Sequence, residues 1–274
     1  MAVAEPPVVV EKSAANKPQS GNASPVAEVQ PPSEHFDGER AYDFLKQICQ
    51  LGPRYSGSPG MQRQQQLLEK YFVDLGGQVQ RQEFQVKRDP RTRRMVPMAN
   101  LIVTWYPERE ERLLLCAHYD TRPLPDQDPD PRLRRSGRFV GANDGASGVA
   151  LLMELGRHLP KQPSQIGVDF VLFDGEEFIF SDRDAYFLGS THFARQYRRQ
   201  PPAHRYSAGV LLDMVGDARL SVYQERHSKS WAPSLVAEIW STAQGLGVRE
   251  FIPRVAYAVE DDHLPLYRIA VSYT

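Results

Sequence analysis

The chain of 274 residues has only two cysteines and almost no net charge. Cys49 and Cys116 are far apart in the sequence, so they can form no disulfide scaffold, and they match no zinc-finger spacing. The formal net charge of −1 produces no overall field that would favour nucleic acid or an acidic membrane. The low number of cysteines excludes a small disulfide-rich domain. The near-zero net charge predicts that nucleic acid is not a partner.

Long hydrophobic runs are also missing. No stretch approaches the roughly 18 apolar residues of a membrane span, and the N-terminus shows no charged region followed by a long apolar one, as a signal peptide would. Residues 1–33 are rich in Pro, Ala, Ser, Glu and Gln. A segment of this composition cannot bury enough apolar surface to offset the conformational entropy lost on ordering. We therefore predict a disordered tether over 1–33, and we favour an exported or membrane-tethered precursor.

From Phe36 onward, apolar residues recur with the spacing of helices and strands. Three short apolar runs, 113–117, 168–173 and 210–212, are typical of buried central strands. Helices are predicted over 39–51, 59–75, 145–159, 189–199 and 231–245, further strands over 78–87, 97–106 and 218–224, and a long surface loop over 122–138. This alternation predicts one α/β domain over 34–274, with a three-layer α/β/α fold around a central mixed, mostly parallel sheet.

Acidic residues and histidines gather where the apolar runs end. They form five clusters: His118-Tyr119-Asp120, Asn143-Asp144-Gly145, Asp174-Gly175-Glu176-Glu177, Leu212-Asp213-Met214 and Glu260-Asp261-Asp262-His263. Four of the five follow or end a short apolar run, and an α/β sheet presents its side chains to a ligand at such strand ends. Because converging carboxylates and imidazoles suit a divalent metal of the zinc type, the sequence predicts a zinc-dependent enzyme that acts on peptide-like amides.

The adjacent acids Glu176 and Glu177 favour catalysis over a solvated turn. Neighbouring residues in a turn point in different directions, so one carboxylate can bind metal while the other faces the substrate as a general acid or base. Apolar runs flank the pair on both sides. Charges between apolar runs are costly to bury unless a partner such as a ligand compensates them.

The other clusters each have a structural alternative. Asp144 precedes small residues at a predicted helix start, so it can cap the helix, bind metal, or do both with its two oxygens. His118 can be a hydrogen-bonded residue at a strand end, although Asp120 two residues later can fix the orientation of a metal-bound imidazole. Asp261 and Asp262 precede an apolar stretch, where the helix dipole alone favours acids. Five such clusters in one order nevertheless favour a common site.

The order of these motifs resembles that of the zinc aminopeptidase family and, within it, the glutaminyl cyclases. The sequence segments that carry this resemblance are Ala117-His118-Tyr119-Asp120, residues 139–146, Phe173-Asp174-Gly175-Glu176-Glu177, Gly189-Ser190 with His192, Leu211-Leu212-Asp213 and residues 260–265. Two features favour the cyclases, namely the long segment between Glu177 and Gly189 and the Asp-Asp-His-x-Pro motif at 261–265.

The resemblance to the cyclases implies a Zn²⁺ ion held by Asp144 and Glu177, with Glu176 as the general acid and base. Asp213 and Asp261 are then the hydrogen-bonded partners of that catalytic glutamate. Such an enzyme is a glutaminyl-peptide cyclotransferase, which converts the N-terminal glutamine of a peptide or protein into pyroglutamate and releases ammonia.

Two rival functions stay open. In a two-zinc aminopeptidase, His118 and Asp213 would hold a second zinc, and Asp144 would bridge the two ions. Asp120 would orient His118, and a metal-bound hydroxide would hydrolyse the first peptide bond. The second rival is a non-catalytic binding domain that kept the pocket and lost its metal.

The chain departs from the family's pattern near its end. The family supplies a further zinc-binding histidine from a Trp-His-Thr-like motif beyond the Asp-Asp-His segment, and residues 268–274 contain no such motif. His263 is not the family's ligand. We therefore expect a chain truncated at its C-terminus that binds zinc poorly, because a catalytic zinc site normally has three protein ligands.

Two further departures affect the expected substrate site. Residues 178–188 lack the tryptophan that cyclases place near the substrate, so Phe178, Phe180 or Tyr186 is expected in its place. Glu260 stands where cyclases often carry glutamine, which leaves the preferred substrate open.

Overall fold

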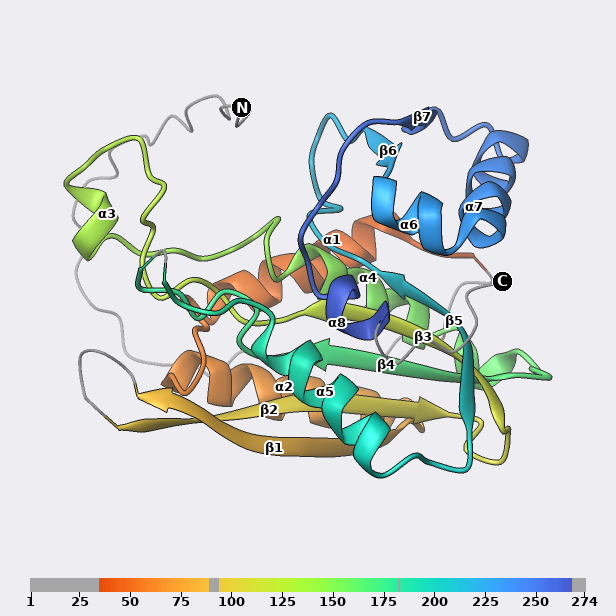
Figure 1. Ribbon diagram of the computed structural model, residues 1–274, viewed down its shortest axis with the longest axis horizontal. Helices are drawn as coiled ribbons and strands as arrows, with labels where there is room; N and C mark the ends of the chain where they lie inside the picture. Colours follow the sequence, from red (N-terminus) through yellow and green to blue (C-terminus); the bar gives the residue numbers. More distant parts are fainter. Residues whose placement is uncertain (1–34, 89–93, 182, 268–274) are drawn as a thin grey trace. The chain divides into compact units, whose positions relative to one another are not determined.

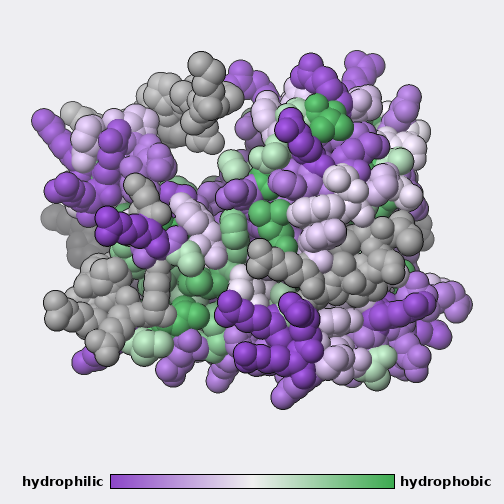
Figure 2. All heavy atoms as spheres, viewed as in Figure 1, coloured by the Kyte–Doolittle hydropathy of each residue, from purple (hydrophilic) through white to green (hydrophobic). Residues whose placement is uncertain are grey.

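The computed structural model describes residues 35–88, 94–181 and 183–267. The tail predicted over 1–33 and the last residues, 268–274, lie outside the described residues. Among the helices in the described ranges, none combines the length and hydrophobicity needed to span a bilayer. On the face shown in Figure 2, hydrophilic side chains predominate, and hydrophobic ones show in a few places between them.

A five-stranded mixed sheet forms the middle layer, in the order β1-β2-β4-β3-β5 (Figure 1). Its strands are β1 (Gln78–Arg88), β2 (Met95–Trp105), β3 (Glu111–His118), β4 (Gly167–Phe173) and β5 (Arg205–Leu211). β2 pairs antiparallel with β1 and β4, whereas β3 pairs parallel with β4 and β5. The three apolar runs of the sequence are therefore the three parallel neighbours β3, β4 and β5.

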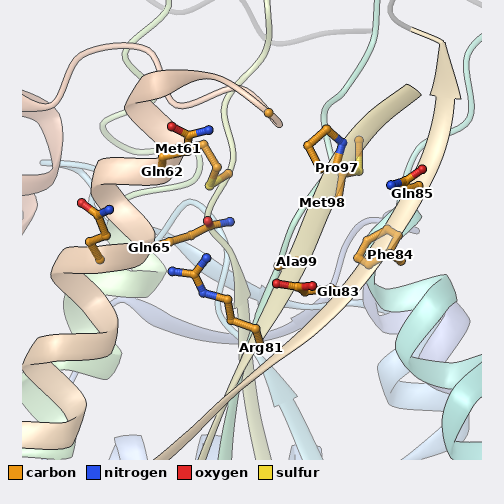
Figure 3. Close-up of a pocket in the computed structure, with 12 residues that line it drawn as sticks. Met61, Gln62, Gln65, Arg81, Glu83, Phe84, Gln85, Pro97, Met98 and Ala99 are labelled. Atoms are coloured by element: carbon orange, nitrogen blue, oxygen red, sulfur yellow. The ribbon is translucent and has the colours of Figure 1, made fainter. Parts of the chain in front are cut away.

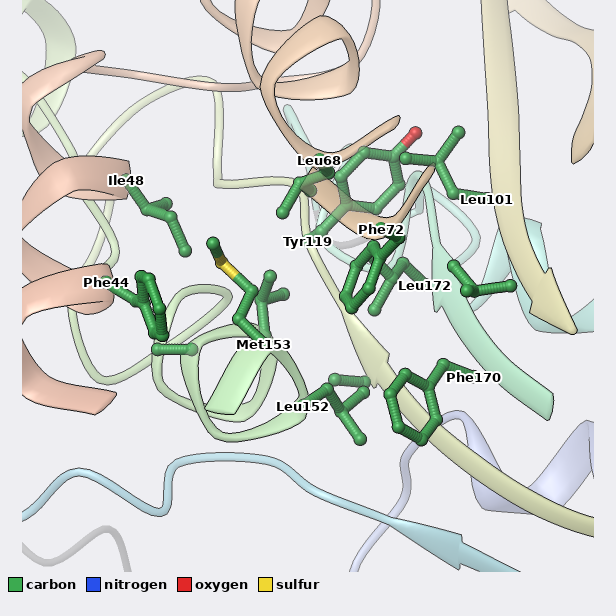
Figure 4. Packing of buried hydrophobic residues seen from close by; sticks show 14 of the residues in the cluster. Phe44, Ile48, Leu68, Phe72, Leu101, Tyr119, Leu152, Met153, Phe170 and Leu172 are labelled. Atoms are coloured by element: carbon green, nitrogen blue, oxygen red, sulfur yellow. The ribbon is translucent and has the colours of Figure 1, made fainter. Parts of the chain in front are cut away.

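Helices cover both faces of this sheet. One face carries α1 (Gly38–Gln50), α2 (Pro59–Asp74) and α4 (Ser147–Gly156), and the other carries α5 (Leu188–Arg199) and α8 (His263–Tyr267). Successive residues of a strand point to opposite faces, and β4 follows this rule. Phe170 and Leu172 pack with the first group of helices (Figure 4), whereas Val171 and Phe173 pack with α5 and α8. The predicted three-layer α/β/α fold with a mixed sheet is confirmed.

The helices begin where local chemistry satisfies their first N–H groups. The Asp37 carboxylate accepts the N–H groups of Glu39 and Arg40 at the start of α1. Ser58 accepts an N–H group at the start of α2, which has proline in its first turn. Both helices lie within one residue of their predicted ranges.

The remaining elements are short except for the helix over Pro233–Gly245. The surface loop predicted over 122–138 contains one brief helix, α3 (Leu133–Ser136), and the 3-10 helix η1 (Leu159–Lys161) follows α4. The later part of the chain forms β6 (Val222–Gln224), α6 (Arg226–Trp231), α7 (Pro233–Gly245) and β7 (Phe251–Val255). The strand expected over 218–224 exists as β6, but it pairs with β7 in a separate two-stranded sheet. The sequence reasoning missed α6 and β7, and α8 begins where a helix start was the structural alternative for Asp261 and Asp262.

Candidate metal centre

Most of the predicted site residues lie at the carboxyl ends of β3, β4 and β5, whereas Asp144 precedes α4 and Asp261 precedes α8. His118 is the last residue of β3 and pairs in register with Phe173, the last residue of β4. The turn that carries Glu176 and Glu177 follows at once, and Asp213 lies two residues beyond the end of β5. Because parallel strands end at the same edge of a sheet, these side chains converge on His118.

The buried imidazole of His118 contacts four carboxylates. Its Nε2 atom lies 3.1 Å from Oδ1 of Asp144 and 3.2 Å from Oδ1 of Asp213. Its Nδ1 atom lies 3.5 Å from Oδ1 of Asp120 and 3.9 Å from Oε2 of Glu176. Burial alone would lower the pKa of this imidazole, but the nearby carboxylates of the three aspartates raise that pKa well above the ordinary value.

Three of these side chains fit a metal ion. One ligand atom each from His118, Asp144 and Asp213 can be chosen so that all lie within 4.8 Å of one another. One imidazole nitrogen with two carboxylate oxygens is a donor set that suits zinc. This is the set that the sequence reasoning assigned to a second zinc in an aminopeptidase.

Glu177 offers a further donor on the other side of Asp144. Its Oε2 atom is buried and has no hydrogen-bond partner within the part of the chain that the structure describes. Burial and the charge of Asp144 raise the pKa of Glu177 to about 8, against the opposing charge of Arg122. A buried carboxylate oxygen without a partner fits a metal ligand. Asp144 therefore lies near both His118 and Glu177. A carboxylate that served two metal-binding positions would lie in such a place.

The sequence reasoning missed Arg122. Its Nε atom donates to Oε1 of Glu177 at 2.5 Å, and its Nη1 atom lies 2.9 Å from both carboxylate oxygens of Asp126. The only sequence signal is the position of Arg122 two residues after Asp120, at the start of the predicted surface loop.

Glu176 is the most strongly perturbed acid of the turn. Its side chain is 12% exposed, and burial is the main reason that its pKa rises to about 10, with the charge of Asp262 adding to the effect and His118 opposing it. A cation bound beside such a carboxyl group would lower this pKa. Its environment suits a group that takes up and releases a proton.

Gly145 lets the Asp144 loop approach β3. Its φ is +86°, and a Cβ atom there would lie 2.3 Å from the carbonyl oxygen of Asp120 and 3.2 Å from Cε1 of His118. The N-cap of α4 is Ala146, which makes no side-chain capping bond. Asp144 is therefore not a helix cap, and the structural alternative considered for it is wrong.

Two acids lie at the start of α8. Burial and the charge of Asp213 raise the pKa of Asp261 to about 7. Asp262 is fully buried and accepts a hydrogen bond from the hydroxyl group of Ser190. The next residue, His263, lies 3.7 Å from Glu225 and packs near Trp231, and no contact described for it reaches the carboxylates around His118.

The three aromatic candidates for the substrate site differ in exposure. Phe178 is fully buried and packs edge-on against Phe180 at 5.0 Å between ring centroids. Tyr186 is 38% exposed and lies beside Phe187. Of the three, Tyr186 has the most surface available to a substrate.

A pocket of about 520 Å³ lies elsewhere, between α2 and the β1–β2 hairpin (Figure 3). Gln65, Arg81, Glu83 and Met98 are among its lining residues, and none of the acids or histidines of the candidate centre lines it. Hydrogen bonds connect its wall to Tyr119, the residue after β3: Gln65 donates to the Tyr119 hydroxyl group at 3.0 Å, and that hydroxyl group donates to the carbonyl oxygen of Ala99. The pocket is therefore a feature separate from the metal centre.

The sequence profile of Peptidase family M28 matches residues 100–273. Among curated proteins, the chain is similar to the glutaminyl-peptide cyclotransferase of Bos taurus, with 26% identity over 257 residues, which is 80% of this chain and 66% of that protein. The chain spans between 51% and 66% of the length of the cyclotransferases of Drosophila melanogaster and Bos taurus.

Solved structures give a closer likeness. The crystal structure of Fimbriiglobus ruber glutaminyl cyclase has a TM-score of 0.81 and 41% identity, and the match covers 92% of this chain and 86% of that one. The structure of a Zn-dependent exopeptidase from Parabacteroides distasonis has a TM-score of 0.77 and 30% identity, over 86% of this chain and 81% of that one. Both resemble this chain along most of its length.

Proposed function

Since the chain belongs to Peptidase family M28, we propose that it is a zinc-dependent glutaminyl-peptide cyclotransferase acting on the N-terminal glutamine of peptides or proteins. One observation carries the proposal: Glu176 is buried with its Oε2 atom 3.9 Å from Nδ1 of His118, in a fold that resembles glutaminyl cyclases over most of the chain. The curated relatives that bear this name support the same reaction.

The residues that would hold the zinc are Asp144 and Glu177, with His118 and Asp213 close by. When bound, a zinc ion would polarise the γ-carbonyl group of the glutamine. Glu177 offers the unpartnered oxygen described above, and Asp144 contacts His118.

Glu176 transfers a proton from the α-amino group of the substrate to its leaving amide nitrogen. It accepts a proton from the α-amino group of the substrate as that nitrogen forms a bond to the γ-carbonyl carbon. It returns the proton to the amide nitrogen as the old carbon–nitrogen bond breaks, so that ammonia leaves and a lactam ring remains. Because the nucleophile belongs to the substrate itself, orientation supplies much of the rate. We assign Asp213 and Asp261 to the proton network around Glu176.

A two-zinc aminopeptidase is the second candidate. The observation in its favour is the group His118, Asp144 and Asp213, whose ligand atoms suit a metal without Glu177. The likeness to zinc exopeptidase structures points the same way.

Product analysis with the purified chain and added zinc tests these functions. A peptide with N-terminal glutamine should lose one ammonia and keep its length if the chain is a cyclase, whereas an aminopeptidase should release free glutamine. A peptide with N-terminal asparagine is the matched control. One zinc per chain favours the cyclase and two favour the peptidase, while absence of both zinc and turnover favours the binding domain.

A further inference from the structure

Asp120 makes its shortest described contacts with the backbone of the catalytic turn. Its Oδ1 atom accepts the N–H group of Glu176 at 3.0 Å, and its Oδ2 atom accepts the N–H group of Glu177 at 3.1 Å. The side chain is fully buried, so water does not compete for either oxygen. One carboxylate therefore holds two consecutive peptide groups.

The contact of Asp120 with the imidazole is longer. Its Oδ1 atom lies 3.5 Å from Nδ1 of His118, beyond the usual N–H···O range of about 2.7–3.2 Å. Orienting His118 was the task expected from the sequence. In this geometry the two backbone amides are the better-placed partners.

Other described bonds hold the turn through Asp174 and through backbone carbonyl groups. The Asp174 carboxylate accepts from the Ser56 hydroxyl group at 2.6 Å and from the N–H group of Ala99 at 3.0 Å, before the two glutamates. The carbonyl group of Glu176 accepts the N–H group of Phe187 at 3.2 Å. Asp120 alone among these groups binds the N–H groups of Glu176 and Glu177 themselves.

We propose that Asp120 is a positioning residue that fixes the backbone of Glu176 and Glu177, so that one carboxylate faces the substrate and its neighbour faces the metal ligands. Hydrogen bonds to an ionised carboxylate are about twice as strong as neutral ones. A backbone rotation at either amide would turn a side chain away from the position that the reaction needs. The catalytic part of this inference rests on the proposed function, whereas the backbone part does not.

Amide hydrogen exchange on the metal-free chain tests the backbone part. Asp120→Asn keeps the size of the side chain but leaves one acceptor oxygen, and its NH₂ group then faces a backbone N–H donor. Losing such a buried bond is worth about 1–3 kcal/mol, or roughly 5- to 150-fold in exchange. We expect the amides of Glu176 and Glu177 to exchange at least about tenfold faster. Unchanged exchange at both amides would overturn the inference.

Tyr206→Phe is the matched control. It removes one buried hydrogen bond, from the Tyr206 hydroxyl group to Asp169 at 2.9 Å, near the opposite end of β3. It should leave exchange at Glu176 and Glu177 unchanged. Equal acceleration in both variants would show a general loss of stability and would overturn the positioning role.

Kinetics separates this inference from the proposed function. In an active parent, Asp120→Asn should lower kcat more than it raises KM, because it displaces the proton acceptor rather than a substrate contact. A parent that cyclises no glutamine contradicts the proposed function but leaves the exchange result valid. If Asp120→Asn does not fold, Asp120→Glu keeps the charge and moves it by one methylene group. It should accelerate the same two amides, and unchanged exchange there would overturn the inference as well.

Discussion

Arg122 donates from Nε to Oε1 of Glu177 and leaves Oε2 of that carboxylate buried and without a hydrogen-bond partner in the described ranges. One oxygen is therefore held by a fixed cation, while the other can bind a second positive charge. The charge of Arg122 also opposes the rise in the pKa of Glu177. Four predictions follow from this and related features of the structure.

Replacing Arg122 by alanine should weaken zinc binding. Without its counter-charge, Glu177 should have a pKa above its present value of about 8 and should be less ionised at neutral pH. Chelator competition at several pH values measures the effect, and the loss should be larger at pH 6 than at pH 9. Arg134→Ala is the control, because Arg134 lies in the same loop and donates to the carbonyl oxygen of Asp128, away from Glu177. Equal zinc affinity of the two variants would contradict the prediction.

Glu176→Gln should abolish turnover and leave zinc bound. The change keeps the shape of the side chain and removes the proton acceptor, and a general base is worth roughly a hundred- to ten-thousand-fold in rate. Steady-state kinetics and metal analysis of the same sample provide the measurement. Glu83→Gln makes the same chemical change in the separate pocket and should retain the parent rate. Turnover of Glu176→Gln within a factor of a few of the parent would remove Glu176 from the mechanism.

The metal-free chain should become less stable as the pH rises from 5 to 9. Burial, together with the charge of Asp120, raises the pKa of Asp174 from 3.8 to about 8, so the folded state binds more protons than the unfolded state between these values. Stability is then fully present below pH 3.8 and is lost as the pH rises through about 8. Each such proton contributes a slope of about 1.4 kcal/mol per pH unit.

Denaturant unfolding at fixed pH values checks this slope. Glu176 and Glu177, whose pKa values rise to about 10 and about 8, contribute with the same sign. Asp174→Asn removes one titrating group with little change of shape, so its stability should depend less on pH than that of the parent. A parent whose stability increases between pH 5 and pH 9 would contradict the assignment.

Arg112→Ala should destabilise the fold strongly. Arg112 is buried and donates to both carboxylate oxygens of Asp169 at 2.8 Å, and its Nη2 atom also donates to the carbonyl group of Trp105. Removing one member of a buried ion pair typically costs about 3–5 kcal/mol. The free energy of unfolding in denaturant measures this cost. Arg205→Ala, which removes an exposed contact with Glu111 at 3.7 Å, should change stability by less than about 1 kcal/mol.

The parts of the fold that could be predicted from the sequence carry strong local patterns. β4 is buried at every position, as the apolar residues around Asp169 in 168–173 predicted. β7 and α6 were missed because they have only five and six residues, too few to show a periodic pattern.

Local patterns also decide which residues of the candidate site could be predicted from the sequence. Acids that end apolar runs, such as Glu176 and Glu177, are visible in the sequence because strand ends at one edge of a sheet must converge. Arg122 was missed because its ion pair joins a loop to a turn 55 residues later. The helix-capping alternative for Asp144 failed because α4 begins at Ser147, beyond Gly145 with its positive φ.

Tyr119 makes the candidate centre part of the hydrophobic core. It lies between His118 and Asp120, yet its ring is fully buried among core residues, and Gln64 and Gln65 of α2 bond its carbonyl and hydroxyl groups. Tyr119 therefore anchors the site to the core, so we expect the geometry of the site to be lost together with the core. On heating, inactivation should coincide with the cooperative melting of the domain, without a separate inactive but folded stage.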